Sequence, residues 1–144
     1  MTPEFLDELV IRAKADGIDR LVVGAVIVRD GKVLLLRRPD RDFMGGIYEL
    51  PSGRVETDEG LADALIREVE EETGLTVTEL TRYLGSFDYT SASGRPTRQH
   101  NFAVTVQTAL DVVLTEHDHA AWTSTAGGNL VTDAVRQVLS EHFA

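Results

Sequence analysis

Cysteine is absent from this chain of 144 residues. A chain without cysteine has no disulfide framework, no thiol nucleophile, no cysteine-ligated zinc and no iron–sulfur cluster. Long hydrophobic runs are absent as well: the longest, Leu21 to Val28, is interrupted by Gly24 and is too short to cross a bilayer. The N-terminus carries acidic residues where a secretory signal would carry basic ones. We therefore expect a soluble, cytoplasmic protein with no membrane partner.

Basic residues are also scarce, and only two of them are lysines. The chain has 24 acidic and 14 basic side chains and a net charge of −10, which argues against a nucleic-acid polymer as a partner. The charge is unevenly distributed. Residues 49–79 hold ten acidic and two basic side chains, a balance of −8, so the other 113 residues carry only −2. The length and the 42% hydrophobic content predict one folded domain.

Local signals in the N-terminal half predict a helix followed by a hairpin. Thr2 can cap a helix, and Gly17 can end it. Asp30-Gly31 joins two β-rich runs and is a strong two-residue hairpin signal. The predicted elements are a helix between Pro3 and Gly17, strands at Leu21–Arg29, Lys32–Arg38 and Ile47–Leu50, and a turn at Pro51-Ser52-Gly53.

The C-terminal half alternates strands and helices without regular βαβ units. We therefore predict an α/β protein of the α+β type, with a mixed sheet and helices packed on it. Gly74 should end the central helix, and Thr132 should cap the last one. The predicted elements are a helix from Gly60 to Thr73, strands at Leu80–Tyr89 and Arg98–Thr108 around the loop Thr90–Thr97, a short strand near Trp122, and a helix from Asp133 to His142.

Three glutamates of the central helix are the most informative residues. Glu68, Glu71 and Glu72 stand at positions i, i+3 and i+4, so they share one turn and border the stripe that packs on the core. Like charges so close together destabilise a helix unless a cation binds them. Mg²⁺ or Mn²⁺ fits this oxygen-rich set, with a phosphate substrate completing the coordination. A plain solvated acidic face is the alternative.

The spacing around these glutamates resembles the Nudix box, G-x5-E-x7-R-E-U-x-E-E-x-G-U, in which U is aliphatic. At about 6% usage per residue type, a chance match of its seven specified residues in this chain is on the order of one in a million. The chain departs from the family only at Ser52, where glycine is common. The box positions are filled by Gly53, Glu59, Arg67, Glu68, Val69, Glu71, Glu72, Gly74 and Leu75.

The resemblance implies a fold and a reaction. Nudix hydrolases form an αβα sandwich around a mixed sheet and hydrolyse a nucleoside diphosphate linked to another moiety, using Mg²⁺ or Mn²⁺. Residues 20–144 would form this domain. Residues 1–19 would be an N-terminal helical extension that packs on the domain, covers the active site or mediates a homodimer.

The resemblance also implies roles for the box residues. Glu68, Glu71 and Glu72 would bind the metal, with the carbonyl of Gly53 as a further ligand. Arg67 would orient Glu71 or Glu68 through a salt bridge, while Glu59 would support the loop before the helix. The general base would be either Glu68 or a residue of the later loop 115–119, where Glu116 is the candidate; a solvated loop acid is an equal alternative for Glu116.

Arginine suits bidentate contacts with phosphate, and three arginines are candidates for binding substrate. Arg38 precedes the active-site loop, Arg54 lies in the box, and Arg98 follows the loop after Tyr89. Three aromatic residues are candidates for facing a nucleobase, although core packing is the alternative for each: Phe43, Tyr48 and Phe102.

The substrate class is predicted from signatures that are missing. Nudix enzymes that act on ADP-ribose tend to carry a proline after the box, and this chain has Ser91 at that position. Those that act on dinucleoside polyphosphates tend to carry a tyrosine slightly farther on, where this chain has Ala92 and Ser93. We therefore expect a MutT-like nucleoside triphosphate pyrophosphohydrolase that releases a monophosphate and pyrophosphate. A nucleotide-sugar pyrophosphatase, such as one for ADP-ribose, is the nearer alternative, and a non-catalytic nucleotide-sensing module is the more distant one.

Overall fold

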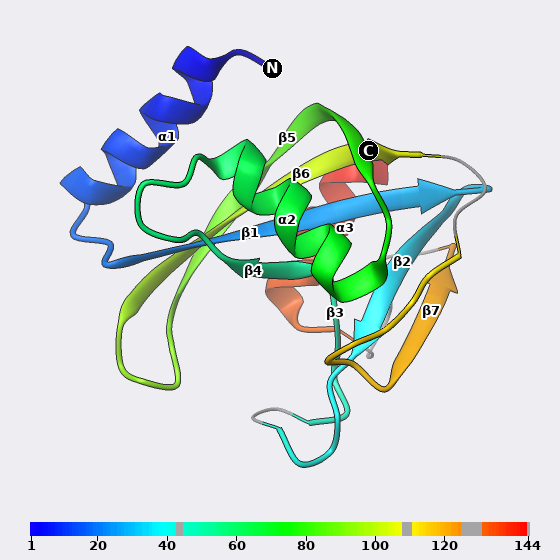
Figure 1. The fold of residues 1–144 in the computed structure, drawn as a ribbon. Coiled ribbons are helices and arrows are strands. Elements are labelled where there is room, and N and C mark those ends of the chain that lie inside the picture. Colours follow the sequence, from blue (N-terminus) through cyan, green and yellow to red (C-terminus); the bar gives the residue numbers. More distant parts are fainter. Residues whose placement is uncertain (43–44, 108–110, 125–130, 144) are drawn as a thin grey trace.

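The computed structural model describes residues 1–42, 45–107, 111–124 and 131–143. These residues form three helices and seven strands (Figure 1). None of the described helices is long and apolar enough to span a membrane. In chain order the elements are α1 Pro3–Ala15, β1 Arg20–Arg29, β2 Lys32–Arg37, β3 Tyr48–Glu49, β4 Ser52–Arg54, α2 Leu61–Thr73, β5 Val77–Thr90, β6 Pro96–Val106, β7 His119–Thr123 and α3 Asp133–Phe143.

The strands form one mixed sheet in the order β3-β2-β1-β6-β5. Strand β1 pairs in parallel with β6, whereas β1 with β2 and β5 with β6 are antiparallel. Strand β4 adds to the start of β1, and β7 adds to β2. The first half of β1 therefore lies between β4 and β6, and this arrangement positions the site described below.

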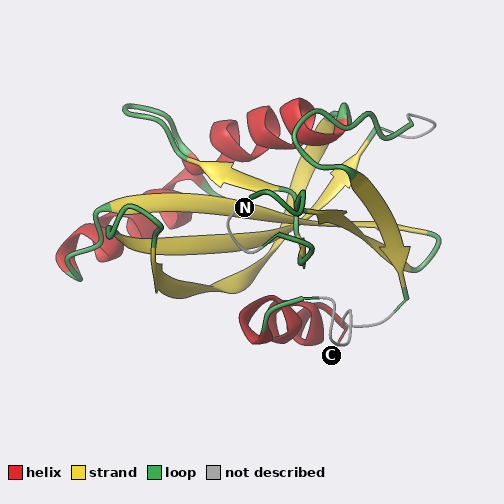
Figure 2. Ribbon diagram, turned by 90° about the horizontal axis from the view of Figure 1, so that it is seen from below, coloured by secondary structure: helices red, strands yellow, loops and turns green. Residues whose placement is uncertain are grey.

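Helices cover both faces of the sheet (Figure 2). One hydrophobic cluster joins α1 and α2 to the sheet through residues that include Leu9, Leu65 and Phe102. A second cluster joins α3 to the opposite face through residues that include Val26 and Leu139. This three-layer arrangement confirms the predicted αβα sandwich of α+β type.

Most of the local signals formed the predicted structures. The Thr2 hydroxyl accepts a hydrogen bond from the Phe5 N–H (3.2 Å), as expected of a helix cap. Asp30 and Gly31 both have positive φ (53° and 75°), which is the conformation of a type I′ hairpin turn. Gly74 ends α2 in the left-handed region (φ 74°) and donates its N–H to the Glu70 carbonyl.

Two predicted boundaries were wrong. The predicted turn at Pro51-Ser52-Gly53 is in part strand β4, because Ser52, Gly53 and Arg54 pair with β1. Strand β5 begins at Val77 rather than at Leu80. Its register shifts against β6 interrupt the alternation of buried and exposed residues along the strand. The last residue of the predicted strand Arg98–Thr108 lies outside the described residues.

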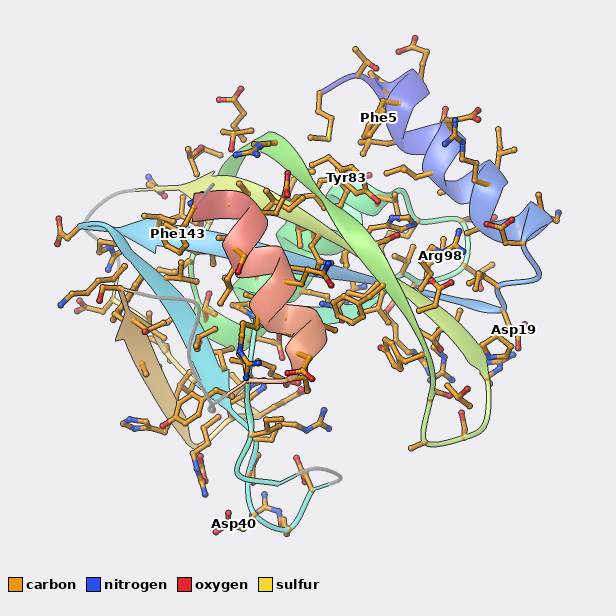
Figure 3. The ribbon with its side chains drawn as sticks, turned by 180° about the vertical axis from the view of Figure 1, so that it is seen from behind. Phe5, Asp19, Asp40, Tyr83, Arg98 and Phe143 are labelled. Atoms are coloured by element: carbon orange, nitrogen blue, oxygen red, sulfur yellow. The ribbon has the colours of Figure 1, made fainter. Side chains whose placement is uncertain are left out.

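Helix α1 lies at one edge of the molecule, with Phe5 close to Tyr83 of β5 (Figure 3). The Phe5 ring stands edge-on to the Tyr83 ring, with 5.4 Å between centroids. At the other end of α1, Arg98 Nη1 donates to Asp16 Oδ2 (2.9 Å). The helix is thus fixed to β5 and β6 by a ring contact and an ion pair.

Candidate active site

Helix α2 directs its three box glutamates to different environments. Glu72 is buried, with only 4% of its surface exposed. The Glu68 side chain is 15% exposed, whereas that of Glu71 is 59% exposed and reaches solvent. The set therefore spans the border between core and solvent, as the helical spacing predicts.

Arg67 holds this region together through five hydrogen bonds. Its Nε and Nη2 donate to the two carboxylate oxygens of Glu59, each at 2.8 Å. Its Nη1 donates to Glu68 (2.7 Å) and Glu71 (3.3 Å), and Nη2 also donates to the Arg54 carbonyl. These hydrogen bonds lower the pKa of Glu59 to about 2, so Glu59 remains charged. Arg67 thus contacts Glu59, Glu68 and Glu71 together, and Glu59 also accepts a hydrogen bond from the Glu56 N–H of the loop before α2.

Gly53 allows α2 to approach the sheet closely. A Cβ atom on Gly53 would overlap the carboxylate of Glu68. Strand β4 fixes this glycine against β1, where it pairs with Val23. The first glycine of the box is therefore required because the Glu68 carboxylate occupies the space of a side chain.

The buried carboxylate of Glu72 accepts a hydrogen bond from the Ser52 N–H (2.7 Å). Its pKa is raised to about 9, mainly by burial and further by the negative charges of Glu49, Glu68 and Glu116. Burial likewise raises the pKa of Glu68, where the charges of Glu71 and Glu116 add to the effect. Negative charge is therefore costly here unless a cation accompanies it.

His117 and Glu49, which are absent from the predicted site, complete this cluster. His117 Nε2 lies 2.7 Å from Glu49 Oε2, and its Nδ1 lies 3.5 Å from Glu72 Oε2. Arg38 Nη1 donates to the other oxygen of Glu49 (3.3 Å). The His117 side chain is only 5% exposed. The position of His117 beside Glu116 in the acidic loop was the available signal, but its partner Glu49 is 68 residues away.

A cavity of 580 Å³ opens beside these groups. Five of the predicted site residues line it: Gly53, Glu72, Glu116, Arg38 and Arg54. The lining also includes Tyr48, His117 and Glu49, and, farther along the sheet, Val22, Phe87, Tyr89 and Gln99.

The structure does not bring Arg98 to this cavity. Neighbouring residues of a strand point to opposite faces, and Gln99 is the one that faces the cavity. Arg98 instead donates to both oxygens of Asp88 (2.7 and 3.0 Å) and to Asp16. Phe102 is fully buried in the core, and Phe43 lies outside the described residues.

The chemistry of the cluster fits a hard divalent cation. Its donors are carboxylate oxygens, and burial disfavours the ionised forms of Glu72 and Glu68 unless a cation binds them. In the described part of the chain no three acidic or histidine side chains already converge on one point. Glu68 and Glu71 instead point to Arg67, and Glu72 to the backbone of Ser52.

The fold and the site together define a class: an αβα sandwich in which a strand led by Gly53 and an acidic helix bring carboxyl groups together beside a cavity. A family model described as NUDIX domain matches residues 19–130, and the chain therefore belongs to the Nudix family. Nudix hydrolases generally use divalent metals.

Several curated proteins are similar in sequence. A CTP pyrophosphohydrolase of Escherichia coli is 41% identical over 83 residues, which cover 58% of this chain and 60% of that protein. An ADP-ribose pyrophosphatase of Methanocaldococcus jannaschii is 34% identical over 93 residues, which cover 65% of this chain and 51% of that protein. The match thus spans between half and three fifths of these relatives.

Solved structures agree on the fold. The solution structure of the E. coli ORF135 protein has a TM-score of 0.74 and 30% identity, covering 89% of this chain and 91% of that one. A MutT Nudix hydrolase from Burkholderia pseudomallei has a TM-score of 0.72 and 29% identity, covering 85% and 96%. The names of the relatives refer to different substrates, so the similarity does not identify the substrate of this chain.

Proposed function

We propose that this chain hydrolyses a phosphoanhydride bond of a nucleoside diphosphate linked to another moiety, with a nucleoside triphosphate as substrate and a monophosphate and pyrophosphate as products. The observation that carries this proposal is a cluster of carboxyl groups beside the cavity, formed by the buried Glu72, the largely buried Glu68 and the exposed Glu116. When ionised these groups repel one another, and a cation that also binds phosphate relieves the repulsion.

Mg²⁺ is the cofactor in this proposal, and Mn²⁺ can replace it. Glu68, Glu71 and Glu72 would hold the metal, with the carbonyl of Gly53 as a further ligand. When bound, the metal would neutralise charge on phosphate oxygens and activate water for attack on phosphorus. Arg67 acts as a positioning residue, since it already contacts Glu68 and Glu71.

Two carboxylates are candidates for accepting a proton from the attacking water. Glu68 is the candidate from the box, and its raised pKa brings it closer to neutral pH. Glu116 is the candidate from the later loop, and it lines the cavity. The two are distinguished by the pH profiles of Glu68→Gln and Glu116→Ala, because the variant that lacks the base loses the acidic limb of the rate profile.

The cavity supplies the contacts for the rest of the substrate. Its 580 Å³ lies within the usual 300–1,000 Å³ or so of small-molecule sites. Arg38 and Arg54 line it near the carboxylates and are the proposed phosphate contacts. Arg98 has no part in this proposal, because Asp88 and Asp16 hold it elsewhere.

An enzyme for ADP-ribose or another nucleotide sugar is the alternative. The similarity to an ADP-ribose pyrophosphatase favours it, and the similarities to a CTP pyrophosphohydrolase and to an 8-oxo-dGTP diphosphatase of Proteus vulgaris favour the triphosphate. A non-catalytic sensing module is disfavoured because every specified position of the box is filled.

A substrate panel tests the proposal. Nucleoside triphosphates, oxidised nucleotides, ADP-ribose and dinucleoside polyphosphates are incubated with Mg²⁺ or Mn²⁺, and the products are identified. We expect pyrophosphate from a triphosphate, no turnover in excess chelator, and a loss of orders of magnitude in Glu71→Gln. The matched control is Glu70→Gln, one residue away on the exposed side of α2, which should keep wild-type turnover. Release of ribose phosphate from ADP-ribose alone would favour the alternative, and tight binding without any turnover would favour a sensing module.

A further inference from the structure

One buried amide lies in the wall of the cavity formed by β1, β5 and β6. Gln99 on β6 pairs with Val22 on β1 and with Phe87 on β5, so these three residues form a row across the sheet. All three line the cavity, as does Tyr89, whose ring centroid is 6.0 Å from that of Phe87. The wall is therefore apolar and aromatic, with the amide of Gln99 in its middle.

The orientation of this amide is fixed by its neighbour Asn101. Asn101 Nδ2 donates to the carbonyls of Gly85 (3.2 Å) and Gln99 (3.3 Å), and carbonyl oxygens can only accept. Asn101 Oδ1 must then face the Gln99 side chain, where it accepts from Nε2 (2.9 Å). Gln99 consequently uses its amide nitrogen on Asn101, and no described residue donates a side-chain or backbone hydrogen bond to its Oε1.

Gly24 makes room for this pair of amides. A Cβ on Gly24 would lie 2.6 Å from both Gln99 Nε2 and Asn101 Oδ1. Both side chains are buried, with 7% of Gln99 and none of Asn101 exposed. A rotation of the Gln99 amide would place two oxygens, Oε1 and Oδ1, against each other in a buried site, which is unfavourable. Oε1 therefore stays on the side of the amide that faces away from Asn101, and Gln99 itself lines the cavity.

The amide lies two strands away from Arg54, a separation that a nucleotide can span. In the sheet, Arg54 on β4 pairs with Val22, which pairs with Gln99. Strands lie about 4.8 Å apart, so Gln99 is about 10 Å across the sheet from Arg54. A substrate whose phosphates lie at β4 and α2 would place its base against Gln99, Phe87 and Tyr89.

We propose that Gln99 is a specificity-determining residue that selects an amino-substituted nucleobase over its oxo counterpart. This inference rests on the proposed function, since it concerns the same cavity. The fixed Oε1 accepts a hydrogen bond from an exocyclic amino group, such as that of cytosine or adenine. A ring that carries a carbonyl at that position, such as uracil or hypoxanthine, brings a second acceptor against Oε1 and leaves both unpaired. A matched amide contact discriminates bases by about tenfold to a hundredfold.

Two nucleotide pairs that differ only in this group test the inference. Relative kcat/KM is measured in mixtures of CTP with UTP and of ATP with ITP, and equilibrium binding is measured for the corresponding monophosphates. The wild type should prefer the amino member of at least one pair by about tenfold or more. Gln99→Leu should bring that ratio close to one. Gln107→Leu, the same change at an exposed position just after β6, should leave the ratio unaltered.

Folding is recorded for each variant by thermal unfolding, and Gln99→Met replaces Gln99→Leu if the latter does not fold. The inference is overturned if the wild type shows no amino preference in either pair, or if the substituted protein keeps that preference. Binding preference without hydrolysis would support the role of Gln99 and contradict the proposed hydrolase function. Hydrolysis without discrimination would support the hydrolase function and contradict the role of Gln99. Absence of both binding and turnover would contradict the hydrolase function and the role of Gln99 alike.

Discussion

Arg67 and Glu59 form a two-pronged ion pair, in which Nε and Nη2 of the guanidinium each donate at 2.8 Å to a separate oxygen of the carboxylate. The Arg67 side chain is 25% exposed and that of Glu59 is 16% exposed. The pair links the loop before α2 to the middle of the helix. It therefore fixes the position of the helix segment that carries Glu68, Glu71 and Glu72 relative to this loop.

Replacement of Arg67 by lysine should therefore cost both activity and stability. Lysine keeps the charge but cannot make parallel hydrogen bonds to one carboxylate while also contacting Glu68. We expect Arg67→Lys to lower the free energy of unfolding by about 1–3 kcal/mol and to lower kcat at least tenfold. Urea denaturation and steady-state kinetics measure the two effects. Arg12→Lys, which alters an exposed ion pair on α1, is the control, and equal effects in both variants would contradict the role of Arg67.

Gly53 and Gly60 provide a second test, because they differ in the space around them. A Cβ on Gly53 overlaps the Glu68 carboxylate, whereas a Cβ on Gly60 meets nothing within 4 Å. Gly53→Ala should displace Glu68 and reduce turnover by at least tenfold, by analogy with the loss of a group that orients a metal ligand. Gly60→Ala should keep wild-type turnover. Steady-state kinetics measure turnover of both variants, and circular dichroism shows whether they fold. Wild-type turnover in Gly53→Ala would contradict the close approach of the Glu68 carboxylate to Gly53.

His117 should affect activity although no box position includes it. It lies between Glu49 and Glu72 and is nearly buried. His117→Asn removes the contact with Glu49 and should lower turnover about 10- to 100-fold, with a higher Mg²⁺ concentration needed for half-maximal rate. The matched control is His119→Asn, since His119 is exposed two residues farther on. Unchanged metal dependence in His117→Asn would remove this residue from the site.

His100 should make stability depend on pH. Its pKa is lowered to about 4, mainly by burial and in addition by the charge of Arg98, while the charge of Asp88 opposes the shift. In the unfolded chain this pKa is about 6.5, so the neutral form stabilises the fold above pH 6.5 and the stabilisation is lost as the pH falls through 4. Between pH 7 and 4.5 the wild type should lose about 2–3 kcal/mol more than His100→Gln does.

Urea denaturation at the two pH values measures this difference. Tyr83 hydrogen-bonds to His100 Nδ1 (2.9 Å), and glutamine retains a polar group for it. His119→Gln serves as the control for an exposed histidine and should show the acid sensitivity of the wild type. Identical losses in wild type and His100→Gln would show that other groups cause the acid sensitivity.

Features encoded by neighbouring residues were predictable from the sequence. The cap at Thr2, the turn at Asp30 and Gly31 and the end of α2 at Gly74 each depend on a few adjacent positions. The glutamates of the box were equally accessible, since their spacing on one helix sets their relative directions. The contacts of Arg67 with Glu68 and Glu71 follow from the same local geometry.

Features that depend on distant pairing were not predictable. Strand β4 has the composition of a turn, and only its pairing with β1 makes it a strand. His117 and Glu49 meet because β7 and β3 both pair with β2, which no local signal reveals. Arg98 was a reasonable phosphate ligand by residue type, but its side chain points to the face of β6 opposite Gln99.

The position of β1 between β4 and β6 has a consequence for how such proteins diverge. The carboxylates belong to α2 and are held by β4, whereas the far wall of the cavity belongs to β5 and β6. Because β1 separates the two groups, substitutions on β5 and β6 leave every hydrogen bond of Arg67 and Glu72 in place. In a protein with this architecture, substitutions on β5 and β6 can therefore change which ligand the cavity binds without changing the arrangement of the carboxyl groups on α2.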